Sequence, residues 1–148
     1  MEPATVNASD FLYIQGRYFL TAYPGAPVGA EGVGRVIAVG PDVDNALNGH
    51  RVVILPTHRY GTWATQIVAD PADVIPVPHG IDVDHLAMLG INPMTAVRLI
   101  RDYGNPDAAG RWIGQTAGNS AVSQYVITLR QALRPQNPEH RTPPRCCA

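Results

Sequence analysis

The sequence contains no lysine, so all eleven basic side chains among its 148 residues are arginines, and these are scattered along the chain. The formal net charge is only -1. A nucleic-acid-binding surface needs clustered positive charge, which this distribution does not provide. No apolar run reaches the roughly 18 residues of a membrane-spanning helix, and the first residues lack the basic and apolar parts of a secretory signal. We therefore expect no nucleic-acid partner, no membrane partner and a cytoplasmic location.

Cysteine is almost absent as well, because the chain has only the adjacent pair Cys146 and Cys147. This pair does not have the spacing of zinc ligands, and no second pair exists to complete such a site. The five histidines also lack metal-ligand spacing: His50, His58, His79, His85 and His140. We predict no metal site, and we expect these histidines to be ordinary surface or turn residues.

Glycine and β-branched residues, in contrast, are concentrated in the stretch from Val28 to Val43. Three glycines at positions 29, 32 and 34 permit sharp bends and close backbone approaches. The alternation that follows predicts a strand from Val33 to Val39 that is apolar on both faces, and Gly40-Pro41-Asp42 ends it as a turn. This pattern is typical of a curved, buried strand in a small β-barrel.

Short strands separated by glycine and proline turns are expected over the rest of the first 80 residues. They span residues 51–55, 62–68 and 74–78, and the last is placed at a sheet edge because proline cannot donate to a ladder. A short helical turn around residues 11–14 precedes them. Tyr18 follows it at the border of a Pro- and Gly-rich loop, where a tyrosine can present its hydroxyl to a cleft.

Helical patterns take over after residue 80. Asp82 is expected to cap a helix through Met88, and Asn92-Pro93 to start another that ends at Gly104. Its core face is expected to hold Met94, Val97 and Ile100. A strand over residues 110–116 then leads through a small polar turn into a helix with a continuous apolar face: Val122, Tyr125, Val126, Leu129 and Leu133. Strand, turn and helix form the opening of a nucleotide-binding unit, although Gly-x-Gly-x-x-Gly is absent.

Six motifs in this order resemble the medium-chain dehydrogenase/reductase superfamily. They are Asn7-Ala8-Ser9-Asp10, Gln15-Gly16-Arg17-Tyr18, Gly29-Ala30-Glu31-Gly32-Val33-Gly34, Gly61-Thr62-Trp63, Gly90-Ile91-Asn92-Pro93-Met94-Thr95-Ala96 and Asn119-Ser120-Ala121-Val122. Within the superfamily the similarity, over about residues 5 to 129, is greatest to the zinc-free 2-enoyl thioester (trans-2-enoyl-CoA) reductases. Zinc-dependent relatives have a metal-ligand histidine directly before the glutamate of the third motif, where this chain has Ala30.

The resemblance implies an α+β to α/β fold. A GroES-like β-barrel domain, incomplete at its N-terminus, is expected over residues 1–88. The first βα unit of a truncated Rossmann domain is expected over residues 89–133. The Arg- and Pro-rich composition of residues 134–148 separately predicts a disordered tail. Both ends of the chain are expected to be shortened relative to the family.

The resemblance also implies an activity. Family members transfer hydride from NADPH to the β-carbon of an enoyl thioester, and a tyrosine gives a proton to the α-carbon; Tyr18 stands in the position of that tyrosine. Asn92, Asn119, Ser120, Ala121 and Val122 match cofactor-contacting positions. A small-molecule enoyl thioester is the implied substrate, and a homodimer is a possible assembly. Two alternatives stay open: a zinc-free quinone oxidoreductase, and an inactive GroES-like module or degraded gene product.

Overall fold

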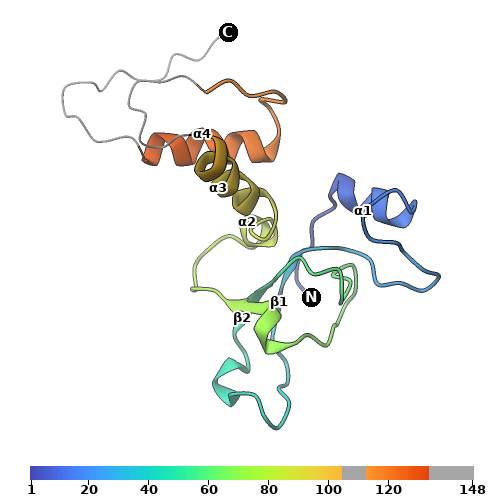
Figure 1. The fold of residues 1–148 in the computed structure, drawn as a ribbon. Helices are drawn as coiled ribbons and strands as arrows, with labels where there is room; N and C mark the ends of the chain where they lie inside the picture. The colour runs from blue at the N-terminus through green and yellow to red at the C-terminus, as the bar shows by residue number, and fades with distance from the viewer. Residues whose placement is uncertain (105–112, 134–148) are drawn as a thin grey trace. The chain divides into compact units, whose positions relative to one another are not determined.

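The computed structural model describes residues 1–104 and 113–133 of the chain and divides into two compact units, Met1–Thr95 and Ala96–Ala148. Figure 1 labels the helices α1 to α4 and the strands β1 and β2. Their bounds are α1 Ala8–Ile14, β1 Gly32–Arg35, β2 Arg51–Ile54, β3 Val74–Pro76, α2 Val83–Ala87, α3 Asn92–Tyr103 and α4 Ala121–Ala132, with single 3-10 turns at Asn45–Leu47 and Pro71–Asp73. The expected tail over residues 134–148 lies outside the described residues. The expected domain boundary between residues 88 and 89 stays a prediction.

The first unit is built on a three-stranded antiparallel sheet in the order β1-β2-β3. Val33 of β1 pairs with Val53 of β2, which pairs in turn with Ile75 of β3. The chain's first residues lie along the outer edge of β1, next to the N-terminus in Figure 1, where the Val33 N–H donates to the Pro3 carbonyl at 3.0 Å. Strand β3 forms the other edge, as its prolines predicted.

Helix α2 covers this sheet and completes a small core. Val33, Val53, Leu86 and Ala87 are all at most 3% exposed and pack together. Asp82 caps the helix by accepting hydrogen bonds from the first-turn backbone N–H groups, as the sequence predicted. The first unit therefore has its core between one sheet face and one short helix.

Two strand predictions need correction. The strand expected to run from Val33 to Val39 ends at Arg35, because Val36 already pairs with the closing turn at Gly49 and His50; Ile37 beyond it is 67% exposed. Residues 62–68 form no strand either. The backbone N–H groups of Thr62 and Trp63 donate to the carbonyls of residues 29 and 28, and no strand ladder is formed by the residues that follow, up to Val68.

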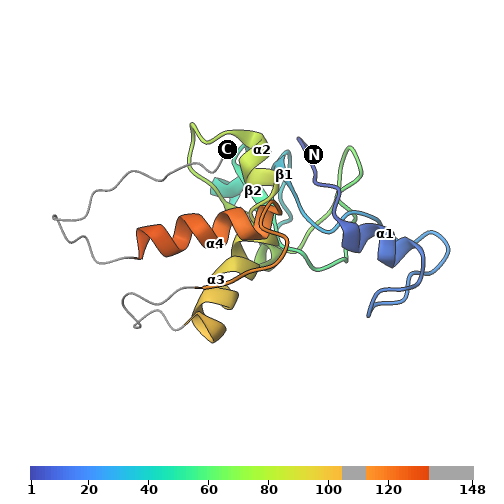
Figure 2. The same ribbon diagram turned by 90° about the horizontal axis from the view of Figure 1, so that it is seen from above.

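In the second unit, the α3 residues from Ala96 onward pack against α4, as Figure 2 shows from above. Ala96, Ile100 and Val126 form the buried centre. The expectation that Met94 and Val97 lie in the core is wrong, because they are 57% and 42% exposed and the buried stripe instead joins residues four apart. The end of α3 just before Gly104 is confirmed.

The strand expected over residues 110–116 is not seen in its described part, residues 113–116, and its first three residues lie outside the described ranges. A strand needs a partner, and the described residues of this unit contain none. Within the described ranges, no helix is long and apolar enough to cross a membrane.

Candidate functional site

Tyr18 lies in a bend four residues after the end of α1 and is half-buried. Its ring centroid is 4.5 Å from that of Phe19 and 5.6 Å from that of His58. Within residues 1–104 and 113–133, no protein group hydrogen-bonds to its hydroxyl. The ring is therefore held by packing while its O–H group is available to a ligand.

Helix α1, which leads to Tyr18, is anchored at its first turn by a buried aspartate. The Asp10 carboxylate accepts from the Asn7 N–H at 2.7 Å and from the Ala30 N–H at 3.1 Å. The hydrogen bond from the Asn7 N–H to the side chain of Asp10, the third helical residue, is part of a capping box. It explains why Asn-x-x-Asp starts a helix here. A second contact fixes the other end, because His58 also packs on Tyr13 at 5.4 Å between ring centroids.

The residue after Ala30 is a fully buried carboxylate, Glu31, with 0% exposure. Its Oε1 accepts from Thr5 Oγ1 and Asn7 Nδ2, each at 3.1 Å, and its Oε2 accepts from the Ile91 N–H at 2.8 Å. Burial raises the pKa of the Glu31 carboxyl above its ordinary value, and the hydrogen bonds from these three residues oppose that rise. One side chain thus joins three separated parts of the chain.

Asn92 comes directly after Ile91, one of the three residues that donate to Glu31. It is the first residue of α3, half-buried, and its neighbour Ile91 both donates to Glu31 and accepts from the Thr95 N–H at 2.9 Å. Gly90 before it leaves little space for a side chain, because an added Cβ would lie 3.0 Å from Glu31 Oε2. The backbone that carries Asn92 is therefore fixed on both sides.

The remaining predicted site residues, Asn119 to Val122, form the start of α4 in the second unit. Ser120 caps this helix, since its Oγ accepts from the Ser123 N–H at 3.2 Å. Asn119 and Ala121 are exposed, whereas the Val122 side chain packs against the core around Val126. The first free amides of a helix point outward from its start, so Ala121 and Val122 can offer N–H groups to an anion.

Tyr18 and Asn92 thus lie in the same unit, in which Glu31 bonds to the residues before α1 and to Ile91 just before Asn92, whereas the residues from Asn119 to Val122 lie in the other unit. The sequence did not predict the connecting role of Glu31, although a charged residue inside an apolar stretch signals a buried, partnered carboxylate. No local pattern indicated His58 as the neighbour of Tyr18. No group of three or more His, Cys, Asp and Glu side chains within the described residues could hold a metal ion.

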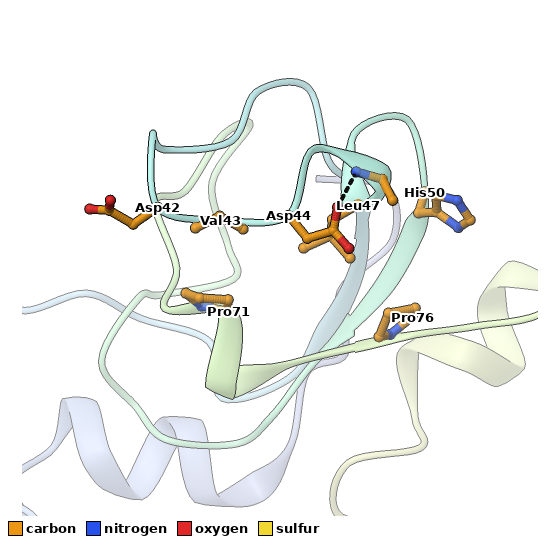
Figure 3. Close-up of a pocket in the computed structure, with 8 residues that line it drawn as sticks. Asp42, Val43, Asp44, Leu47, His50, Pro71 and Pro76 are labelled. Atoms are coloured by element: carbon orange, nitrogen blue, oxygen red, sulfur yellow. Dashed lines mark hydrogen bonds between the residues drawn. The ribbon is translucent and has the colours of Figure 1, made fainter.

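A separate pocket of about 450 Å³ lies in the first unit between the 42–50 segment and the prolines of the 71–76 segment (Figure 3). It contains none of the predicted site residues. Its polar groups are few, and Asp44 is already engaged as a cap that accepts from the Ala46 N–H at 2.9 Å. Tyr18 and Asn92 therefore remain the better candidates for chemistry.

The antiparallel sheet with its covering helix defines the class of protein, a GroES-like domain of the alcohol dehydrogenase type. The family model described as the alcohol dehydrogenase GroES-like domain matches residues 1–79, and the chain belongs to this family. The predicted resemblance to the medium-chain dehydrogenase/reductases, and among them to the enoyl thioester reductases, is confirmed by the relatives described below.

Among curated proteins, the chain is 41% identical over 134 residues to the mitochondrial enoyl-[acyl-carrier-protein] reductase of Mus musculus, covering 90% of the chain and 35% of that protein. Among solved structures, a Mesorhizobium loti protein described as an NADPH:quinone reductase matches with a TM-score of 0.74 at 30% identity, over 87% of the chain and 38% of that structure. The Etr1p/NADP/crotonyl-CoA complex matches with a TM-score of 0.69 at 26% identity, over 88% and 41%. The chain therefore spans well under half the length of each of these three relatives.

Proposed function

We propose that this chain provides the proton-donating side, and the first cofactor contacts, of an NADPH-dependent reductase that acts on the C2–C3 double bond of 2-enoyl thioesters. The observation that carries the proposal is Tyr18, a half-buried phenol four residues after the end of an anchored helix, with no protein partner on its hydroxyl within the described ranges. The similarity to the mouse enoyl reductase, over 90% of the chain, supports the same substrate class.

The residues of α4 fit a dinucleotide phosphate, because the Ser120 cap leaves first-turn amides directed out of a helix of 12 residues. The bound cofactor would supply a hydride to the β-carbon. Asn92 can both donate and accept hydrogen bonds, so it suits the polar edge of a cofactor.

Tyr18 supplies the proton that the reduction needs in addition to the hydride. Reduction of a C=C bond consumes one hydride and one proton, and the phenol O–H can deliver the proton to the α-carbon as a general acid. Such a donor contributes roughly 10² to 10⁴ in rate. The tilted packing on Phe19 and His58 restricts the ring, so the hydroxyl keeps its direction between turnovers.

The experiment is NADPH-dependent reduction of a 2-enoyl thioester such as crotonyl-CoA by the full chain and its Tyr18→Phe variant. We expect turnover to fall roughly 10²- to 10⁴-fold while NADPH affinity stays constant. Tyr23→Phe is the matched control, because Tyr23 is 64% exposed in the neighbouring loop. Thioester turnover that survives in Tyr18→Phe would refute the role of this residue.

A zinc-free quinone reductase is the second candidate, favoured by the match to the Mesorhizobium loti structure at 30% identity. It predicts that Tyr18→Phe reduces a quinone as fast as the unmodified chain does. A non-catalytic module is the third candidate. It predicts that titration with NADPH produces no saturable change in nicotinamide fluorescence.

A further inference from the structure

We propose that Glu31 is a positioning residue of the reductase site, which ties the segment carrying Tyr18 (residues 5–18) and the segment carrying Asn92 (residues 90–95) to one buried carboxylate. Both segments and Glu31 lie in the first unit, Met1–Thr95. The inference rests on the proposed function, because it assigns Tyr18 and Asn92 the roles given above.

The Tyr18 segment is tied at its beginning. Thr5 Oγ1 and Asn7 Nδ2 both donate to Glu31 Oε1, and Asn7 Nδ2 also donates to Thr5 Oγ1 at 3.1 Å. Asp10, the titratable residue in the adjoining turn, is buried and binds the Ala30 N–H next to Glu31. A seven-residue helix then carries this anchorage toward Tyr18.

The Asn92 segment is tied through backbone. The Ile91 N–H donates to Glu31 Oε2 at 2.8 Å. The Gly90 backbone N–H also faces this carboxylate and acts to lower the pKa of Glu31. Because Ile91 immediately precedes Asn92, loss of this bond would free the start of α3. The two oxygens of one side chain therefore serve the two segments separately.

A carboxylate is a costly choice for this position if packing alone is needed. Burying a charge costs several kcal/mol unless it is well hydrogen-bonded, and an apolar side chain would fill the same space more cheaply. None of the ion pairs observed among the described residues includes Glu31. What a carboxylate adds is two acceptor oxygens on one rigid group, and here they receive donors from two segments about 60 and 24 to 26 positions away in the sequence.

Two substitutions at Glu31 distinguish the effect of side-chain length from the effect of charge. Glu31→Asp keeps the charge but shortens the side chain by one C–C bond, about 1.5 Å, so the carboxylate cannot meet both sets of donors. Glu31→Gln keeps the length. Its carbonyl oxygen can accept from Ile91, and its NH₂ group can donate to Thr5 Oγ1 and to a flipped Asn7 amide. Positioning predicts a defect in Glu31→Asp that Glu31→Gln largely rescues.

The first measurement is amide hydrogen exchange at Ile91 in the full chain without cofactor or substrate. We expect exchange to be about tenfold faster in Glu31→Asp, the effect of one lost hydrogen bond, and within about threefold of the unmodified chain in Glu31→Gln. Equal protection of Ile91 in all three proteins would overturn the proposal. If Glu31→Asp does not fold, Thr5→Val is used in its place. It removes one donor on the Tyr18 side and should leave Ile91 protected while lowering kcat.

The second measurement is steady-state turnover. We expect kcat of Glu31→Asp to fall about tenfold with KM for the thioester within about twofold, and Glu31→Gln to keep kcat within about threefold. The control is Thr62→Val, because the buried Thr62 hydroxyl donates to the Glu31 main-chain carbonyl at 2.8 Å and not to either segment. This variant should lose stability but not kcat. A similar kcat loss in Thr62→Val would reduce Glu31 to a general stabilising role. If no protein shows turnover, the proposed function fails, while the exchange data still decide whether Glu31 ties the segments.

Discussion

Gly29→Ala is expected to destabilise the first unit strongly. Gly29 has a φ of +94°, and a Cβ at this position would lie 2.5 Å from Trp63 Cδ1, 2.6 Å from Thr62 Oγ1 and 2.8 Å from the Trp63 backbone nitrogen. The last atom cannot move freely, because the Trp63 N–H is bonded to the Val28 carbonyl and the Thr62 N–H to the Gly29 carbonyl. Both the conformation and the space at this position therefore exclude a side chain.

Two costs add in this variant. A non-glycine residue in the left-handed region costs about 1 to 2 kcal/mol, and inserting a methyl group into a packed site costs about 1 to 3 kcal/mol. The free energy of unfolding should therefore fall by about 2 to 5 kcal/mol. Gly25→Ala is the matched control. Gly25 has a φ of +84° but no atom within 4 Å of an added Cβ, so only the first cost applies.

The assay is urea unfolding followed by Trp63 fluorescence in a Trp112→Phe background. With a slope of about 2 kcal/mol per molar urea, a loss of 3 kcal/mol lowers the midpoint by about 1.5 M. Gly25→Ala should shift it by less than about 1 M. If the two variants lose the same stability within about 0.5 kcal/mol, the close approach of residues 28–29 to residues 62–63 does not constrain the fold.

Two further predictions concern pH and helix capping. The hydrogen bond from Arg51 Nε at 2.6 Å lowers the pKa of Glu2 below its ordinary value, so the contribution of this pair to stability is complete above that ordinary value and is lost as the pH falls through the lowered folded value. Glu2→Gln should therefore cost about 0.5 to 1 kcal/mol at neutral pH and nothing in strong acid, as measured by urea unfolding at several pH values; a pH-independent difference would contradict this. Ser120→Ala should cost α4 about 1 kcal/mol through loss of the cap on Ser123, seen as an earlier loss of circular dichroism on heating. Thr128→Ala, which removes only an exposed bond to the Gln124 carbonyl, is its control, and an equal effect of the two would argue against the cap.

The sequence was most informative where a local signal specifies a local structure. Asp82 predicted the start of α2 and Gly104 the end of α3, because caps and stops depend on residues within a turn of one another. Val74 to Pro76 was placed correctly at a sheet edge, since proline lacks the N–H of a central strand. The order of six motifs was sufficient to indicate the family.

Prediction from the sequence failed where a strand or a core depends on a distant partner. Residues 62–68 alternate like a strand, but only Thr62 and Trp63 find carbonyls to bond, at residues 29 and 28. Met94 and Val97 have the spacing of a core face, yet the packing against α4 buries Ala96 instead. Periodicity shows that a face is apolar, whereas the neighbouring element decides which face is covered.

The glycine-rich stretch around Glu31 illustrates the division most clearly. By itself the sequence determined that residues 28–43 bend, form a strand and end in a turn, because these properties depend on glycine, β-branched residues and proline. Only the tertiary structure decided what Glu31 does. Its hydrogen-bond donors come from residues 5, 7 and 91, and nothing in their spacing along the chain indicates that one carboxylate lies between them.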